Sequence, residues 1–242
     1  MKNLLFLIAI SRPYGWLIAP FVFLIGLFYS GAGFEYRAVP ELIALTFPIC
    51  LILFGLNDLY DFESDKLNPR KKMLEPYSRD RRLILMGSAV SAALLLLASA
   101  VSYNPGNAGV MIVLLLLSWS YSSPPLRLKE RPPLDSLSNG ILFYLVFSLG
   151  WSFGRPISEI PPKIYFISIC GAAIHTYASL MDYSADKKAG HKTFAVVTGK
   201  RLTALISAAV FVIAYMFAGI GRVYINYYLI YCAILMLVSF IF

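Results

Sequence analysis

The chain has 242 residues, of which 59% are hydrophobic and only 14% are charged, and its mean hydropathy is +0.70. A soluble globular domain of this length is far less apolar, so the composition predicts a polytopic membrane protein, which we expect to be an all-α helical bundle. The net charge of +8 does not require a nucleic-acid partner, because basic loops on one side of a lipid bilayer explain it.

Met1-Lys-Asn and seven apolar residues open the chain before Ser11-Arg12-Pro13 interrupts them. We interpret this opening as a retained helix that lies in the membrane interface. Eight apolar stretches that are long enough to span a bilayer follow. They run approximately over residues 14–30, 38–58, 83–101, 107–121, 135–153, 162–181, 201–220 and 224–242. We treat residues 1–242 as a single transmembrane domain.

Basic residues are distributed unevenly between the predicted loops. Placing the N-terminus in the cytoplasm leaves only four of the 21 lysines and arginines on the far side, namely Arg37, Arg155, Lys163 and Arg222. Cytoplasmic loops carry the excess of such residues in membrane proteins. The sequence therefore predicts a cytoplasmic N-terminus, with the polar loops after the second, fourth and sixth spans also in the cytoplasm.

The stretch 55–72 follows the second apolar run and is rich in acidic side chains. If the helix continues through it, Asn57, Asp61 and Asp65 lie four residues apart on one face. Asp58 falls with them inside an arc of roughly 100°. Like charges on one helix face repel each other, so the cluster suggests a bound cation, and all-oxygen ligands favour magnesium or another hard ion. A solvated acidic face at a helix end is the alternative.

A second acidic pair follows the sixth apolar run. Asp182 and Asp186 repeat, 125 residues later, the spacing with which the first motif begins. This offset predicts two pseudo-repeated halves of four helices each, roughly residues 1–130 and 131–242. Both motifs then lie on the cytoplasmic side, where pseudo-symmetry would bring them face to face.

Two facing acidic clusters beside basic loops suit a diphosphate bridged by magnesium, because carboxylates hold the metal ions while metals and cations neutralise the phosphoryl oxygens. When a diphosphate leaves an allylic group, the carbocation survives best in a dry pocket with aromatic walls. Aromatic residues make up 15% of this chain. The pattern therefore suits transfer of a prenyl group, whereas hydrolysis would need a positioned water.

Four motifs, in the right order on these spans, resemble those of the UbiA-type intramembrane prenyltransferases. They are Ser11-Arg12-Pro13, Asn57-x-x-x-Asp61-x-x-x-Asp65, Tyr121-Ser-Ser-Pro-Pro-Leu-Arg-Leu-Lys129 and Asp182-x-x-x-Asp186. The resemblance covers nearly the whole chain. It implies a helical bundle with a lateral channel for the prenyl tail and cytoplasmic loops over the polar site. The eight predicted spans are one fewer than the nine usual in that family.

The resemblance also implies roles for individual residues. The implied magnesium ligands are Asn57, Asp58, Asp61, Asp65, Asp182 and Asp186. The implied diphosphate ligands are Arg12, Asn57, Lys72, Tyr121, Arg127 and Lys129. The predicted catalytic residues are Asp61, Asp65, Asp182 and Asp186. Each of the basic residues is also explained as an ordinary cytoplasmic charge, and Tyr121 as an aromatic side chain at the membrane interface.

The opening Ser-Arg-Pro-x-x-Trp and the segment 124–139 look more like the lycopene elongase branch, which adds a prenyl unit to a carotenoid. Many members with aromatic acceptors carry an Arg-Pro pair after the first motif, whereas this chain has Asn68-Pro-Arg-Lys-Lys72. We therefore expect magnesium-dependent transfer of a prenyl group from an allylic isoprenyl diphosphate to a lipophilic acceptor such as lycopene. An aromatic or quinone precursor, or a glycerol lipid, remains an alternative acceptor.

Two other membrane functions also use acidic residues. A CDP-alcohol phosphotransferase needs an Asp-Gly-x-x-Ala-Arg opening, whereas Leu59 follows Asp58 here. A transporter would place its carboxylates near the middle of the membrane, whereas the acidic residues of this chain cluster at span ends. The sequence therefore favours the prenyltransferase and keeps a transporter as the non-enzyme alternative.

Overall fold

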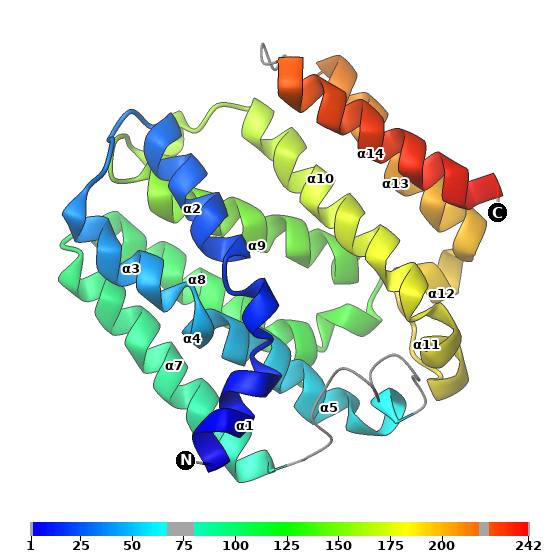
Figure 1. Cartoon of the computed structure of the whole chain (residues 1–242), viewed down its shortest axis with the longest axis horizontal. Helices are drawn as coiled ribbons and strands as arrows, with labels where there is room; N and C mark the ends of the chain where they lie inside the picture. Colours follow the sequence, from blue (N-terminus) through cyan, green and yellow to red (C-terminus); the bar gives the residue numbers. More distant parts are fainter. Residues whose placement is uncertain (1, 67–79, 218–222, 242) are drawn as a thin grey trace. The chain divides into compact units, whose positions relative to one another are not determined.

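The computed structural model describes residues 2–66, 80–217 and 223–241, and these segments contain helices and no strand (Figure 1). Most of the helices are apolar on several sides, as is typical of segments that cross a membrane. The predicted all-α fold is confirmed.

The helices form two compact units. The first unit, Met1–Leu126 with Leu145–Ile160, contains α1 (Lys2–Ile10), α2 (Ile18–Tyr29), α3 (Val39–Ala44), α4 (Phe47–Cys50), α5 (Leu56–Asp65), α7 (Arg81–Val101) and α8 (Pro105–Ser122). The second unit, Arg127–Tyr144 with Pro161–Phe242, contains α10 (Lys163–Ala178), α11 (Tyr183–Ala189), α12 (Phe194–Thr198), α13 (Lys200–Phe217) and α14 (Val223–Ile241). The helix α9 (Leu134–Trp151) begins in the second unit and ends in the first. The single domain and its pseudo-repeated halves stay predictions.

The first unit has an apolar core between α1, α5, α7 and a π-helical segment, Leu51–Gly55, that precedes α5. Ile10, Leu51, Leu59 and Ile84 are buried in this core. Burying such side chains removes apolar surface from the surroundings and fills the space between the helices. Because Leu59 belongs to α5, the core fixes the helix that carries the first acidic motif.

The helix α2 and the end of α9 cross with their backbones in contact. A Cβ atom on Gly26 would overlap the carbonyl oxygen of Phe147, and one on Gly150 would overlap that of Phe23. Small residues allow such close approach where lipid supplies no hydrophobic driving force between helices. The crossing therefore requires glycine at both positions.

A buried carboxylate, Glu41 of α3, joins several helices of the first unit. Ser102 Oγ and Asn107 Nδ2 each donate a hydrogen bond to it over 2.8 Å. Asn107 also donates to the carbonyl oxygen of Leu149 over 3.1 Å and accepts a hydrogen bond from Ser152. Ionisable groups inside a membrane span are costly unless they are partnered. This network therefore fixes α3 against α8 and the end of α9.

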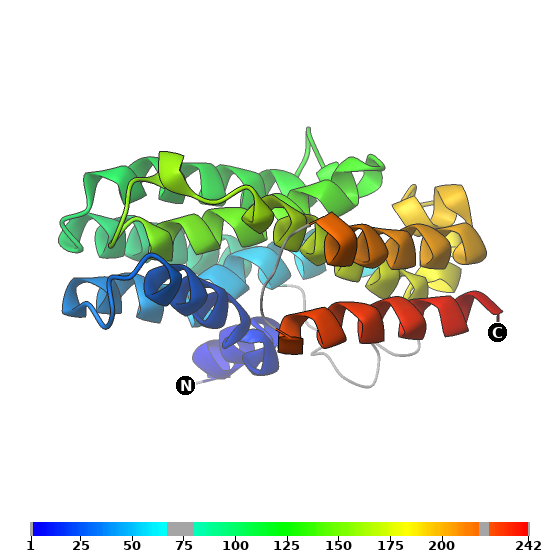
Figure 2. The same ribbon diagram turned by 90° about the horizontal axis from the view of Figure 1, so that it is seen from above.

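The core of the second unit lies between α10, α13 and α14. Phe211 of α13 is fully buried there with Leu229 and Met236 of α14 and with Cys170 of α10. The helices α13 and α14 run side by side (Figures 1 and 2). These contacts anchor the end of the chain to α10, the helix that leads into the second acidic motif.

Four described helices are long and apolar enough to cross a membrane, namely Tyr36–Phe62, Arg81–Val101, Lys163–Met181 and Lys200–Phe217. The bent pair Lys2–Ile10 and Pro13–Tyr29, with an angle of 49° between its helices, would be a fifth span. The other predicted spans fall on α8, α9 and α14. The count of eight spans stays a prediction.

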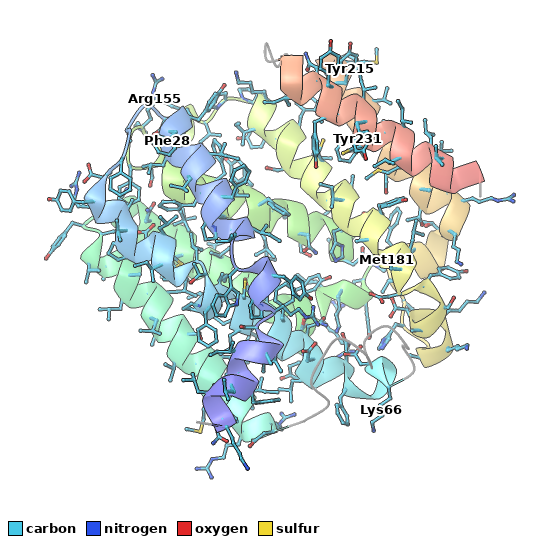
Figure 3. The ribbon with its side chains drawn as sticks, viewed as in Figure 1. Phe28, Lys66, Arg155, Met181, Tyr215 and Tyr231 are labelled. Carbon is cyan, nitrogen blue, oxygen red and sulfur yellow. The ribbon has the colours of Figure 1, made fainter. Side chains whose placement is uncertain are left out.

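Large apolar side chains are exposed on both units. Phe28 in the first unit and Tyr215 and Tyr231 in the second project outward from their helices (Figure 3). A soluble protein rarely exposes many such side chains, whereas a surface that faces lipid requires them. The exposed side chains therefore agree with helices that lie in a bilayer.

Candidate active site

The first acidic motif lies on α5, directly after the π-helical segment of the second span. The motif is helical, as predicted, so Asn57, Asp61 and Asp65 follow each other at intervals of four residues along one side of α5. Leu56 and Leu59, on the opposite side, are fully buried. Segments of π-helix are frequent at functional sites. The buried leucines therefore orient the polar side of α5.

Asp58, the fourth predicted metal ligand on α5, is paired with Arg12. Arg12 Nη2 lies 2.7 Å from Asp58 Oδ1, and the two side chains are only 12% and 17% exposed. The guanidinium carbon of Arg12 lies 4.5 Å from the ring centroid of Phe54, a cation–π contact. Arg12 has a positive φ of 56° in the break between α1 and α2. Metal binding by Asp58 stays a prediction, and its contact with Arg12 is a finding.

The C-terminal end of α8 lies beside the first motif. Ser122 Oγ donates to Asn57 Oδ1 over 3.4 Å, a long hydrogen bond. Tyr121, predicted to bind the diphosphate, is the preceding residue of α8. Lys72, predicted to do the same, lies outside the described residues. Within the first unit, the structure thus brings Arg12 and Ser122 to members of the first motif.

The second acidic motif lies at the start of the short helix α11. Asp182 precedes the helix, and Asp186 N donates to Asp182 O over 2.9 Å. The helix ends at Ala189, and the next residue, Gly190, has a φ of +79° and an N–H that donates to Lys187 O over 3.3 Å. The N–H of His191 donates to Asp186 O over 2.9 Å. These two bonds form a Schellman motif, which requires a residue such as glycine that accepts the left-handed conformation.

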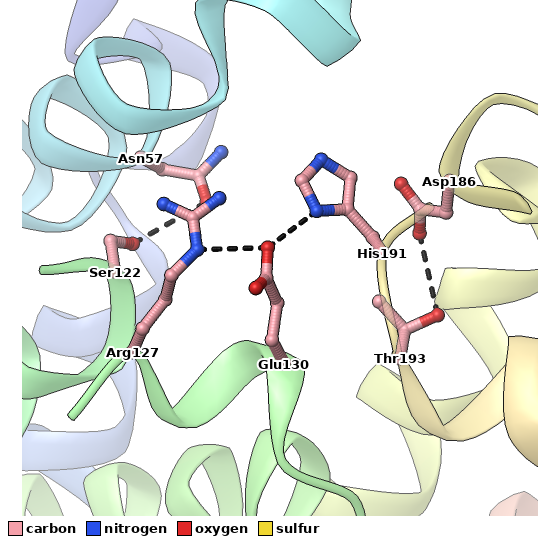
Figure 4. A network of polar contacts seen from close by, with 7 residues as sticks. All are labelled: Asn57, Ser122, Arg127, Glu130, Asp186, His191 and Thr193. Carbon is pink, nitrogen blue, oxygen red and sulfur yellow. Dashed lines mark hydrogen bonds and ion pairs between the residues drawn. The ribbon is translucent and has the colours of Figure 1, made fainter. Parts of the chain in front are cut away.

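The basic loop between α8 and α9 is organised around Glu130 (Figure 4). Arg127 Nε donates to Glu130 Oε1 over 2.8 Å, and the same oxygen contacts His191 Nδ1. Arg127 has a positive φ of 43°, and Lys129 is buried. Within the second unit, the structure therefore brings the predicted diphosphate ligand Arg127 close to the loop that ends α11.

Two further contacts fix that loop. Thr193 Oγ1 donates to Asp186 Oδ2 over 3.4 Å. Phe194 N donates to Asp135 Oδ2 over 2.5 Å, at the points where α12 and α9 begin. Buried carboxylates are stable in proteins when backbone N–H groups are directed at them. The segments 127–135 and 190–194 are thus joined by two acidic side chains.

Sequence reasoning missed Glu130 and Asp135 as members of this polar cluster, and it did not connect either of them with His191, which follows the second motif. The distance along the chain between Glu130 and His191 gives no local pattern, because their contact is tertiary. One signal was present in the sequence. A glycine after a short charged helix predicts the helix end and places the next residue over the last turn.

The donor atoms of the two motifs fit a hard cation. The predicted ligands offer carboxylate oxygens and the amide oxygen of Asn57, with no sulfur and no imidazole nitrogen, which is the set magnesium prefers. Within the described parts of the chain, no three side chains of His, Cys, Asp or Glu converge as a metal cluster. Magnesium is commonly held by one or two carboxylates together with substrate phosphates. Each motif therefore fits a metal whose remaining ligands come from a phosphorylated substrate.

Comparison with known proteins gives the family. Residues 19–242 match the UbiA prenyltransferase family. A lycopene elongase/hydratase from Haloarcula japonica is 30% identical over 82% of this chain and 68% of its own length. A lycopene elongase/hydratase from Halobacterium salinarum is 30% identical over 85% of this chain and 78% of its own length.

The same fold occurs in a solved structure. A UbiA homolog from Archaeoglobus fulgidus bound to DMAPP and Mg²⁺ matches with a TM-score of 0.74 at 23% identity, over 98% of this chain and 86% of that chain. The family match confirms both the predicted class of enzyme and the predicted integral membrane protein with many helices. The chain belongs to the UbiA prenyltransferase family.

Proposed function

We propose that this protein uses magnesium to transfer a prenyl group from an allylic isoprenyl diphosphate to a carotenoid such as lycopene within the membrane. The observation that carries the choice of acceptor is the 30% identity to two relatives named lycopene elongase/hydratase. The related fold from Archaeoglobus fulgidus was solved with DMAPP and Mg²⁺. That structure supports an allylic diphosphate as the donor and magnesium as the cofactor here.

In this proposal the two aspartate motifs bind the diphosphate through magnesium. Asn57, Asp61 and Asp65 provide the oxygen ligands at the first motif. Asp182 and Asp186 provide those at the second. Bound magnesium neutralises charge that develops on the departing diphosphate. The helical spacing along α5 supports this assignment, because it directs the three side chains of the first motif to one side.

Basic side chains complete the diphosphate site. Arg12 and Arg127 are each held by a carboxylate, at 2.7 Å and 2.8 Å respectively. Holding a guanidinium in place before substrate arrives reduces the entropy lost on binding. We assign Lys129, Tyr121 and Lys72 to the same diphosphate. This arrangement would place positive charge where the leaving group becomes most negative.

The reaction then proceeds by cleavage of the bond between C1 of the prenyl group and the diphosphate oxygen. The bonding electrons leave with the diphosphate, and a double bond of the acceptor attacks the allylic cation to form a carbon–carbon bond. The resulting cation on the acceptor loses a proton or captures water. A polyene acceptor needs no strong base for the bond-forming step.

Two other acceptor classes remain alternatives under this proposal, an aromatic or quinone precursor and a glycerol lipid. Their acceptor atoms are a ring carbon and a hydroxyl oxygen, so the products differ in mass from a prenylated carotenoid. A transporter is no longer an alternative, because the family consists of prenyltransferases.

We also propose that the N-terminus and the loops of the site face the cytoplasm. The excess of basic residues in the loops after the second, fourth and sixth predicted spans supports this orientation. A reporter fused to the N-terminus that fluoresces only in the cytoplasm is expected to be active. An inactive reporter, together with an active one in the loop after the first span, would reverse the orientation.

The acceptor is tested with membranes that contain the protein, supplied with magnesium and dimethylallyl diphosphate. Lycopene and 4-hydroxybenzoate are offered separately, and the products are identified by mass spectrometry. We expect a prenylated carotenoid and no change in the benzoate. A prenylated benzoate without any carotenoid product would reject the carotenoid acceptor and leave the family assignment intact.

A further inference from the structure

A histidine that the proposed function does not use, His191, lies beside the second aspartate motif. We propose that His191 is a further ligand of the diphosphate, which it binds through Nε2 while Glu130 holds the ring through Nδ1. This inference rests on the proposed function, because it assumes that the second motif receives a diphosphate. His191 would then be a diphosphate ligand that lies outside both aspartate motifs.

The backbone places His191 next to Asp186. In the Schellman motif at the end of α11, the N–H of His191 donates to Asp186 O over 2.9 Å. Gly190 makes this turn possible with its φ of +79°. The Cα atom of His191 is therefore fixed one turn away from a side chain to which we assign a magnesium ion.

Glu130 determines how the imidazole ring is turned. Its Oε1 atom contacts His191 Nδ1 and also accepts from Arg127 Nε over 2.8 Å. A carboxylate only accepts hydrogen bonds, so the ring donates at Nδ1. The hydrogen bond between Phe194 and Asp135 joins the same two segments a second time. Glu130 is thus the positioning residue for both Arg127 and His191.

The other ring nitrogen is available for a ligand. His191 Nε2 is buried and has no hydrogen-bond partner among the described residues. In Figure 4 it points away from Glu130. A buried nitrogen without a partner is unfavourable in the absence of a ligand. A phosphate oxygen placed against Nε2 would satisfy this nitrogen.

The competing explanation is that His191 only supports the loop by its contact with Glu130. Two substitutions separate these roles because each keeps one end of the imidazole. His191→Asn retains an amide near the position of Nδ1 and loses everything at Nε2. His191→Gln extends its amide to the position of Nε2. Lys192→Ala, which removes an exposed charge from the adjacent residue, is the control for a general loss of positive charge.

The experiment measures the affinity of the purified full chain in detergent for inorganic pyrophosphate with magnesium, by calorimetry. We expect His191→Asn to weaken binding about 10- to 100-fold, as loss of a hydrogen bond to a charged group does. His191→Gln and Lys192→Ala are expected to bind within about fivefold of the unsubstituted protein. The reverse order, with His191→Gln weaker than His191→Asn, would overturn the proposal in favour of a supporting role. Equal affinities for all four proteins would overturn it as well.

NMR of the unsubstituted protein tests the same inference even if a variant does not fold. The chain contains only two histidines, so nitrogen NMR of ¹⁵N-labelled histidine resolves the four imidazole nitrogens. We expect magnesium pyrophosphate to shift the Nε2 signal of His191 and to leave both signals of His175 in place. An unchanged Nε2 signal while pyrophosphate binds would reject the inference alone. An absence of pyrophosphate binding would reject the proposed function with it.

Discussion

The first aspartate motif is carried by one continuous helix, whereas the second is assembled from a short helix and the loops around it. On α5 the intervals between Asn57, Asp61 and Asp65 follow from helical geometry alone. At α11 the position of Asp186 depends on a Schellman motif and on a hydrogen bond from Thr193. The first motif is therefore fixed by helical geometry, and the second by the turn that ends its helix and by the loop that follows.

The arginines assigned to the two motifs are more alike than the motifs themselves. Arg12 and Arg127 both have positive φ, at 56° and 43°. Each is bound by a carboxylate, from Asp58 and Glu130 respectively. Non-glycine residues rarely adopt this backbone conformation, and they tend to do so where function requires it. The shared feature of the two motifs is thus a cation held in position by an acid.

The largest expected effect tests whether the two motifs are equally necessary. Asp61→Ala and Asp186→Ala should each lower kcat/KM at least about 100-fold, because each removes a proposed metal ligand rather than a packing group. Turnover of dimethylallyl diphosphate and the melting temperature are measured together. Glu159→Ala, which changes an exposed acid on a short helical turn, is the control and should leave both values unchanged. Activity within tenfold of the unsubstituted protein at either motif would show that this motif is dispensable.

A smaller effect is expected when the acid that holds Arg12 is changed. Asp58→Asn should lower kcat/KM about tenfold, because Arg12 loses its ion pair and its position. The magnesium concentration that gives half-maximal activity should stay unchanged. Arg12→Ala should have a similar effect, and the double variant should be no worse than either single one. A requirement for much more magnesium in Asp58→Asn would instead identify Asp58 as a metal ligand.

A third pair of variants isolates the Schellman motif. Gly190 and Gly31 both have positive φ, at +79° and +87°, and a Cβ atom on either would meet no atom within 4 Å. Alanine at each position should therefore cost a similar backbone strain of about 1–2 kcal/mol, seen in the unfolding midpoint. Only Gly190→Ala should also weaken pyrophosphate binding, by about three- to fivefold, because it moves His191 and Asp186. Equal binding by both variants would mean that the end of α11 does not shape the site.

The smallest effects are expected from the two long hydrogen bonds to the motifs. Ser122→Ala and Thr193→Val remove donors that lie 3.4 Å from Asn57 and Asp186. Such bonds are weak, so each substitution should change kcat/KM less than about threefold. A tenfold loss in steady-state assays of Thr193→Val, but not of Ser122→Ala, would show that the second motif depends even more on its loop contacts.

The difference between the motifs also explains what could be predicted from the sequence. Spacing of four residues after an apolar run was enough to predict the acidic face of α5. The contact of Glu130 with His191 joins residues far apart in the chain, and no periodic pattern carries that information. The predicted span 38–58 is found as the apolar helical segment Tyr36–Phe62, within which α3, α4 and a π-helical segment follow one another. Pro48, which lacks an N–H group and was visible in the sequence, lies in α4, where this segment departs from a regular α-helix.

The proposed function requires both aspartate motifs to bind an allylic diphosphate through magnesium. The most direct test is thermal unfolding of the purified protein with magnesium alone, dimethylallyl diphosphate alone, and both together. At 100 times Kd a ligand stabilises by about 2.7 kcal/mol, which corresponds to a rise in Tm of about 5–10 °C for a chain of this size. We predict this rise only with both ligands, its loss in EDTA, and its loss in Asp61→Ala and in Asp186→Ala. A rise of the same size with the diphosphate in EDTA would contradict the claim.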